Sequence, residues 1–278
     1  VERVQTSDDI SDALERLKNK RWYYLAVPGL GDGETDTVVE YIKEQRTQYH
    51  KTFKAILPLA AADNEGIINF ATDNIKVGAK TYTTAEFCCR IAGILAGLPL
   101  NRSATYYTLP EVESITESET PDDDVDNGKL ILINDGTKIK IARGVNSLTT
   151  ATEDKGEDFK KIKIIEAVDM IRDDIRATFE DEFVGKVENS YDNKIVFIAA
   201  VNKYFKDLAN RGVLYDKYDN KAEIDIDETR EWLSKTRDVS SWDDEKIKTA
   251  NTGTNVFVRA SIQIQDAIED LKFGIYIE

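Results

Sequence analysis

The chain has 278 residues, of which 41% are hydrophobic and 32% are charged, and its formal net charge is −15. This length and composition predict about two globular domains with substantial cores and argue against a disordered chain. The excess of acidic residues, with no cluster of Lys and Arg, argues against nucleic acid as a partner. No run approaches the roughly 18 apolar residues of a membrane helix, and the N-terminus has no signal-peptide pattern, so we expect a cytoplasmic product without a membrane partner.

The first part of the chain alternates helix and strand patterns. The predicted elements are a helix after a capping-box pattern at Thr6 and Asp9 (10–17), a strand (22–27), a helix (about 36–48) and a strand (53–57). A strand, a helix and a second strand in this order form a β-α-β unit, whose crossover makes the two strands parallel neighbours. The sequence therefore predicts an α/β domain with a mainly parallel sheet.

The middle of the chain contains shorter elements. We expect strands at 67–70 and 75–82, a helix from Thr83 to Gly97 capped by Thr83 and Glu86, a short acidic helix between Thr120 and Gly128, and a hairpin (129–133 and 137–143) around Asn134-Asp-Gly136. Two long helices (about 160–184 and 192–210), a strand (223–226) and two helical segments (227–234 and 242–249) follow. This change to long helices indicates a second domain of α+β type.

Two strand-like runs, Val256–Asp266 and Leu271–Glu278, end the chain. The first alternates apolar and polar residues, which is typical of a strand with one buried face. A terminal strand either closes its own sheet or adds to the edge of another subunit's sheet, and the pattern leaves both alternatives open. The candidate assembly interface comprises Val256, Val258, Ala260, Ile262, Leu271, Phe273, Ile275, Tyr276 and Ile277.

Patterns that would carry chemistry are weak. The Gly29–Gly33 loop lies between a strand and a helix, where phosphates bind in other folds, but its spacing does not fit a nucleotide-binding motif. Asp122, Asp124 and Asp126 match only the start of a calcium loop, and an acidic first turn of a helix explains them better. We therefore expect no cofactor and no metal.

Catalytic residues are equally poorly supported. His50 is the single histidine, and no serine lies in a Gly-x-Ser-x-Gly elbow. The adjacent Cys88 and Cys89 fall in a predicted helix, where their side chains diverge and cannot form a disulfide. The residues give no positive evidence for an enzyme. An α/β enzyme that uses the Gly29–Gly33 loop remains as an alternative, and so does a generic cytosolic binding module.

Three segments, Ala92–Tyr106, Asn134–Thr150 and Asn251–Ile262, resemble the tail sheath proteins of contractile phage tails and related particles, particularly those of Gram-positive hosts. The first contains "PLNRSATY" and the second ends in "RGVNSLTT". The resemblance implies a subtilisin-like α/β domain without protease residues (1–128), followed by a C-terminal α+β domain (129–278) that ends in a linking strand.

The resemblance also implies a function and partners. The subunit would polymerise helically around a tail tube through strand exchange between copies, contact baseplate and tail terminator proteins, and contract to drive the tube through the host envelope. Its location would be a virion or phage tail-like particle assembled in the host bacterial cytoplasm. Because Val1 is not a methionine, we interpret the sequence as a fragment or a processed form. The resemblance implies that it lacks the family's N-terminal arm, and we expect it to be largely monomeric by itself.

Overall fold

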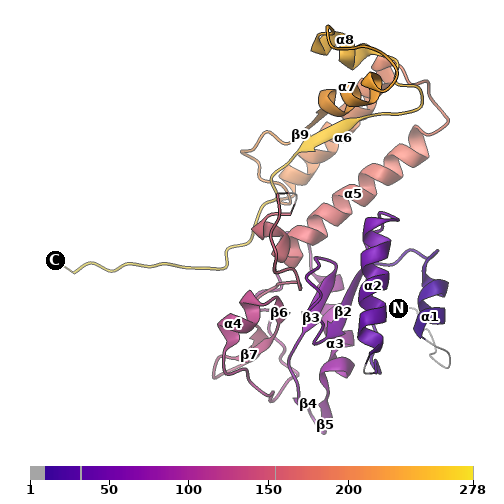
Figure 1. The fold of residues 1–278 in the computed structure, drawn as a ribbon. Helices are drawn as coiled ribbons and strands as arrows, with labels where there is room; N and C mark the ends of the chain where they lie inside the picture. Colours follow the sequence, from indigo (N-terminus) through magenta and orange to yellow (C-terminus); the bar gives the residue numbers. More distant parts are fainter. Residues whose placement is uncertain (1–9, 32, 154, 278) are drawn as a thin grey trace. The chain divides into compact units, whose positions relative to one another are not determined.

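The computed structural model describes residues 10–31, 33–153 and 155–277, and the chain divides into two compact units (Figure 1). Unit 1 comprises residues 1–169 together with 267–278, and unit 2 comprises residues 170–266. The chain therefore leaves unit 1 within helix α5 (Ile162–Glu182) and returns to it after Asp266. The predicted capping box at Thr6 and Asp9 lies outside the described residues.

A four-stranded parallel sheet forms the centre of unit 1. Its strands are, in spatial order, β1 (Tyr24–Ala26), β2 (Lys54–Pro58), β3 (Ile67–Phe70) and β6 (Lys129–Leu130). Helix α2 (Glu34–Thr47) connects β1 to β2, and Tyr24 lies opposite Lys54 in the parallel register. The predicted β-α-β unit and the parallel pairing of its two strands are confirmed.

Both faces of this sheet are covered, and β2 shows why. Ala55 and Leu57 belong to one core with residues of α1 (Ile10–Leu17) and α2, whereas Ile56 belongs to a second core with residues of α3 (Thr84–Gly97). Successive side chains of a strand point to opposite faces, so a strand that is apolar throughout packs on both sides. The result is a layer of helices on each face of the sheet.

Helix α3 begins as the sequence predicts. The Thr83 side chain accepts from the backbone N–H of Glu86, and the Glu86 carboxylate accepts from the N–H of Thr83, which completes a capping box. On this helix Cys88 is buried and its thiol donates to the Thr84 carbonyl, whereas Cys89 is exposed. The two cysteines are free and diverge as expected; burial raises the pKa of the Cys88 thiol to about 12.

Two predicted strands differ from the structure. The run 75–82 forms two short antiparallel strands, β4 (Ile75–Val77) and β5 (Lys80–Tyr82), because Gly78 adopts a φ of 59° and turns the chain. The predicted strand 129–133 is split: β6 joins the parallel sheet beside β3, while β7 (Leu132–Asn134) pairs with β8 (Ile139–Ile141). The hairpin at Asn134-Asp-Gly136 is thus present with shorter strands.

The region around the predicted domain boundary at 128/129 belongs to unit 1. Helix α4 (Pro121–Asp126) precedes it, and its expected cap Thr120 makes no side-chain capping bond. The Ser118 hydroxyl instead accepts from the Thr120 N–H and donates to the Asp124 carboxylate, which connects the residues before the helix to its first turns. Since β6 hydrogen-bonds to β3, the residues that follow Gly128 continue unit 1 up to position 169.

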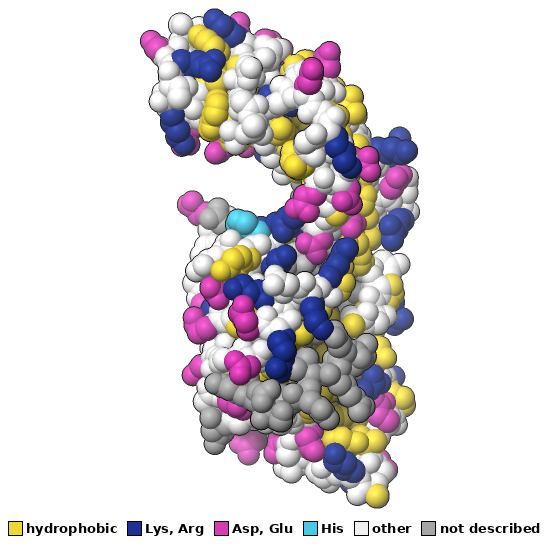
Figure 2. Space-filling model, turned by 90° about the vertical axis from the view of Figure 1, so that its right-hand side faces the viewer, with side chains coloured by type: hydrophobic (Ala, Val, Ile, Leu, Met, Phe, Trp, Pro, Cys, Tyr) yellow, Lys and Arg dark blue, Asp and Glu magenta, His cyan; other side chains and the backbone are white. Residues whose placement is uncertain are grey.

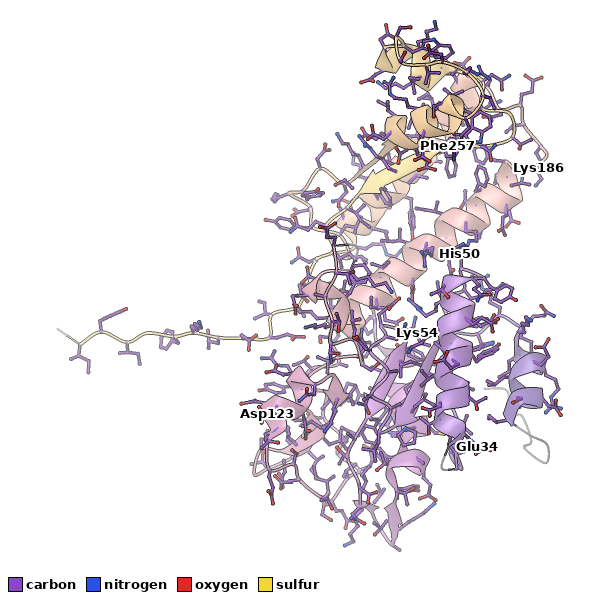
Figure 3. All side chains as sticks on the ribbon, in the orientation of Figure 1. Glu34, His50, Lys54, Asp123, Lys186 and Phe257 are labelled. Atoms are coloured by element: carbon purple, nitrogen blue, oxygen red, sulfur yellow. The ribbon has the colours of Figure 1, made fainter. Side chains whose placement is uncertain are left out.

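A cluster of buried charges lies at the edge of the sheet where β1 and β2 begin. Arg46 at the end of α2 binds both carboxylate oxygens of Asp169, at 2.9 and 3.1 Å. Lys54, labelled in Figure 3, lies 3.0 Å from Asp169 and 3.2 Å from Glu166. Glu65 lies 3.4 Å from Arg46. These contacts attach the first turns of α5 to the sheet.

Unit 2 is built from helices and one small sheet. After a 3₁₀ turn at Glu157–Lys160 in unit 1, the elements are α5, α6 (Tyr191–Asn210), β9 (Lys221–Ile224), α7 (Ile226–Ser234), α8 (Asp244–Thr249) and β10 (Val258–Ser261). Phe197 of α6 makes edge-to-face contacts at 5.1 Å with Phe179 and Phe183 of α5. A second core joins Leu233, Val239 and Ile247 around α7 and α8.

Candidate assembly site

The first C-terminal run is paired within unit 2. Strand β10 runs antiparallel to β9, with Val258 opposite Ile224 and Ala260 opposite Ala222. Beyond β10 the pairing continues, since Tyr215 N–H donates to the Gln263 carbonyl at 2.8 Å and Gln265 N–H donates to the Val213 carbonyl at 2.9 Å. Of the two alternatives for this run, closure of its own sheet is therefore realised.

The outer edge of β9 is blocked by helix α6. The Asn202 side chain accepts from the Ala222 N–H at 2.6 Å and donates to the Ala222 carbonyl at 3.1 Å, as a neighbouring strand would. The peptide groups of Ala222 consequently point away from β10. In an antiparallel ladder, bonded and non-bonded pairs alternate, so Ala222 and Ala260 form a non-hydrogen-bonded pair.

The same alternation fixes the edge of β10 that faces away from β9. Asp225 N–H donates to the Phe257 carbonyl at 3.0 Å, which marks 257 as a bonded position. Positions 256, 258, 260 and 262 then direct their N–H and C=O groups outward. Among residues 10–31, 33–153 and 155–277 no strand pairs with that edge. Four predicted interface residues, Val256, Val258, Ala260 and Ile262, thus share one edge of β10, with Ala260 exposed and the others half-buried.

The second run forms no secondary structure. Residues 271–277 are extended and exposed in the segment that Figure 1 draws in yellow. The exposed fractions are 84% for Leu271, 77% for Phe273, 74% for Ile275 and 94% for both Tyr276 and Ile277. Exposing five large apolar or aromatic side chains in one short segment is unfavourable in water, and such segments mark interaction sites.

The weaker candidates acquire no support from the geometry. Glu34, labelled in Figure 3, places its carboxylate 2.6 Å from the backbone N of Gly31, so a carboxylate occupies the donor that a phosphate would need. Asp124 is bound by Lys129 and Ser118, each at 2.6 Å, and the part of the chain that is described holds no group of three metal ligands. His50 lies three residues beyond the end of α2 at an exposed position, and Figure 2 shows this histidine at the surface.

The surface and the helices carry two further observations. Lys and Arg side chains are interspersed with Asp and Glu over the face drawn in Figure 2. Within the described ranges, no helix combines the length and the apolar character that crossing a membrane requires.

Comparison with known proteins matches nearly the whole chain. The family model of the phage tail sheath protein central domain matches residues 4–147, and that of the phage tail sheath C-terminal domain matches residues 154–278. The chain belongs to the phage tail sheath family. The tail sheath protein of Clostridium phage phiCD119 is 38% identical over 269 residues, which cover 96% of this chain and 75% of that protein.

Solved sheath structures have the same fold. The sheath tail protein of Desulfitobacterium hafniense superimposes with a TM-score of 0.70 at 21% identity, over 78% of this chain. The chain spans only 53% of that protein. The helical sheath of the anti-feeding prophage in its contracted state gives a TM-score of 0.67 at 12% identity and covers 99% of this chain and 76% of that one. The predicted resemblance is confirmed, and the comparisons give no support to a nucleotide-binding enzyme.

Proposed function

We propose that this chain is the structural subunit of a contractile sheath, which polymerises helically around a tail tube and contracts to drive the tube through the host envelope. The paired observations that carry the proposal are the outward edge of β10 and the exposed apolar segment 271–277. An extended segment and a free sheet edge are the two halves of β-augmentation. Segment 271–277 of one copy adds to the β10 edge of another.

The polarity of this exchange explains a helical assembly. Each copy gives a segment from one surface and receives a segment at a different surface, so the contact is heterologous. Heterologous contacts that do not close into a ring continue into a helix. Contraction needs no nucleotide, because the contracted lattice has the lower free energy. During contraction each copy keeps its strand partners while its other contacts rearrange.

The finer features follow from the same proposal. Unit 1 corresponds to the α/β domain, for which we propose the subtilisin-like topology, and unit 2 contributes the C-terminal sheath domain with the receiving edge. Partners are further copies of the chain, the tail tube protein, and baseplate and tail terminator proteins. The particle, a virion or a phage tail-like assembly, forms in the host bacterial cytoplasm.

A proline at the β10 edge tests the strand exchange. Ala260→Pro removes an N–H that points away from β9, so we expect the monomer to keep its circular dichroism spectrum and thermal midpoint while tubes fail to form. The matched control is Arg259→Pro, which removes an N–H directed at β9 and should lower the thermal midpoint by several degrees. Electron microscopy checks tube formation. Normal tubes of Ala260→Pro would refute strand addition at this edge.

The proposal also predicts that the chain has no hydrolase or nucleotide-turnover activity. We expect ATP and GTP at millimolar concentration to leave the thermal midpoint unchanged, because Glu34 occupies the amide of Gly31 and a ligand stabilises only the state that it binds. A nucleotide-dependent increase in the midpoint would favour the enzyme alternative. So would a hydrolase activity that disappears in His50→Ala.

A further inference from the structure

Residues Glu269 and Asp270, where the chain has returned to unit 1 and immediately before the exposed segment 271–277, form ion pairs with Arg143. Arg143 Nη1 lies 3.0 Å from Glu269 Oε2, and Arg143 Nη2 forms an ion pair with Asp270 Oδ1. Ile268, between these acids and unit 2, is 99% exposed, so apolar burial does not retain this stretch. The residues 267–270 and Arg143 line a hollow of about 520 Å³ together with Val125 and Lys161.

The backbone next to Arg143 is hydrogen-bonded through both polar groups of Gly144. Gly144 N–H donates to the Thr105 hydroxyl at 3.0 Å, and the Gly144 carbonyl accepts from the Ile162 N–H at 2.9 Å. A Cβ on Gly144 would lie 3.3 Å from the Ala104 Cβ and from the Ser103 hydroxyl, so the chain packs closely against residues 103 and 104 here. The two sequence segments that end in "SATY" and "RGVNSLTT" therefore meet here and hold the backbone from which the Arg143 side chain projects.

The ion pairs are also better placed than ordinary surface pairs. The Arg143 side chain is 30% exposed and that of Glu269 is 16% exposed, so solvent screens this contact less than a contact between fully exposed ions. Asp270, at 77% exposure, contributes a more screened second contact. One guanidinium that binds two consecutive residues restricts the backbone direction as well as the position of the chain.

We propose that Arg143 is a positioning residue for assembly: it clasps Glu269 and Asp270 and so fixes, on unit 1, the point from which segment 271–277 leaves toward another copy. This inference rests on the proposed strand exchange. From Asp270, residues 271–277 reach at most about 25 Å; release of 267–270 would add about 14 Å and transfer the point of attachment to unit 2. The distance between two linked copies is then less restricted, and segment 271–277 is no longer held in place before it binds the next copy.

The clasp is tested first without assembly, by cleavage of the isolated chain with a lysine-specific endoproteinase. Lys272 lies two residues beyond Asp270, and a protease must bind the residues on both sides of the cleaved bond in its cleft. The ion pairs of Arg143 with Glu269 and Asp270 should therefore slow cleavage after Lys272. We expect Arg143→Gln to increase the initial rate of release of peptide 273–278 by about fivefold, a change typical of losing one partly buried charge pair. Arg102→Gln, which removes an exposed arginine elsewhere in unit 1, is the matched control and should leave the rate unchanged.

Charge reversal and tube formation complete the test. The swap Arg143→Glu with Glu269→Arg and Asp270→Arg restores the ion pairs without adding a lysine, so slow cleavage should return. Under conditions in which the unmodified protein forms tubes, Arg143→Gln should give few or irregular tubes by electron microscopy. The charge-reversed variant should form regular tubes again. Unchanged cleavage in Arg143→Gln would overturn the clasp, and faster cleavage with normal tubes would overturn its role in assembly. Failure of the strand exchange itself is distinguished by Ala260→Pro, whose clasp is intact.

Discussion

We expect truncation after Asp270 to abolish sheath tubes while the subunit remains folded. Residues 271–277 are exposed along their length and belong to neither hydrophobic core of unit 1, so their removal costs the monomer little stability. In the assembly, the same residues supply the strand that joins one copy to the next, and nothing else in the described chain offers an extended apolar segment of this kind. The clasp at Arg143 is retained by the truncated chain.

Electron microscopy, under conditions in which the unmodified protein forms tubes, measures assembly. Circular dichroism and thermal unfolding measure whether the truncated subunit is folded. Lys272→Gln is the matched control, because it alters the same segment without removing its apolar side chains, and it should form normal tubes. Normal tubes from the truncated protein would show that the segment does not link subunits. Loss of the native spectrum would show instead that the segment belongs to the subunit's own fold.

Local patterns predicted α2, α3 and β2 of unit 1, because neighbouring residues determine each of these elements. Thr83 and Glu86 specify the start of α3 whatever surrounds them, and the apolar run at β2 demands cover on both faces. At Gly78 the local pattern does not determine the structure. Its turn divides one apparent strand into two, and a lone glycine within a strand pattern does not by itself distinguish a turn from a bulge.

Pairing across long separations could not be predicted in the same way. β6 looked like one strand of a local hairpin, yet it pairs with β3, and this moves residues 129–169 into unit 1. The alternation from 256 to 264 indicated a strand, which the structure forms over Val258–Ser261, but the expected burial of one face is not reached, since Ala260 is exposed. The pattern could not choose between partners, because β9 and a second copy present the same backbone groups. Asn202 decides which edge stays open, and no sequence pattern around it signals that role.

The attachment of α5 to the sheet illustrates a further limit. Arg46, Lys54 and Asp169 are all less than 10% exposed, although charged residues in an acidic chain are expected at the surface. Their positions in sequence give no sign that they meet. Burial raises the pKa of Glu65, but Arg46 and Lys155 lower it more, so its net pKa lies below the ordinary value. Burial acts on Arg46 in the opposite sense and is likewise outweighed by Asp169 and Glu65.

This charge cluster gives the largest expected effect on stability. Asp169→Ala removes the carboxylate that binds Arg46 through both oxygens and Lys54 at 3.0 Å. The carboxylates that remain beside these buried cations are Glu65, 3.4 Å from Arg46, and Glu166, 3.2 Å from Lys54. Breaking one partner of a buried ion pair costs about 3–5 kcal/mol, because the remaining charge stays in a poorly solvated site. We expect the free energy of unfolding of unit 1 to decrease by about that amount.

Urea unfolding followed by the fluorescence of Trp22, in a background with Trp232→Phe and Trp242→Phe, reports this change, since Trp22 stacks on Phe53 within unit 1 at 3.9 Å. Asp181→Asn, at an exposed position of the same helix, is the control and should change stability by less than about 0.5 kcal/mol. Because Asp169 is the last residue of unit 1 on a helix that continues into unit 2, the same substitution should also make tubes fragile under shear. A loss below about 1 kcal/mol would show that Glu65 and Glu166 neutralise the cations by themselves, and that Asp169 is not what fastens α5 to the sheet.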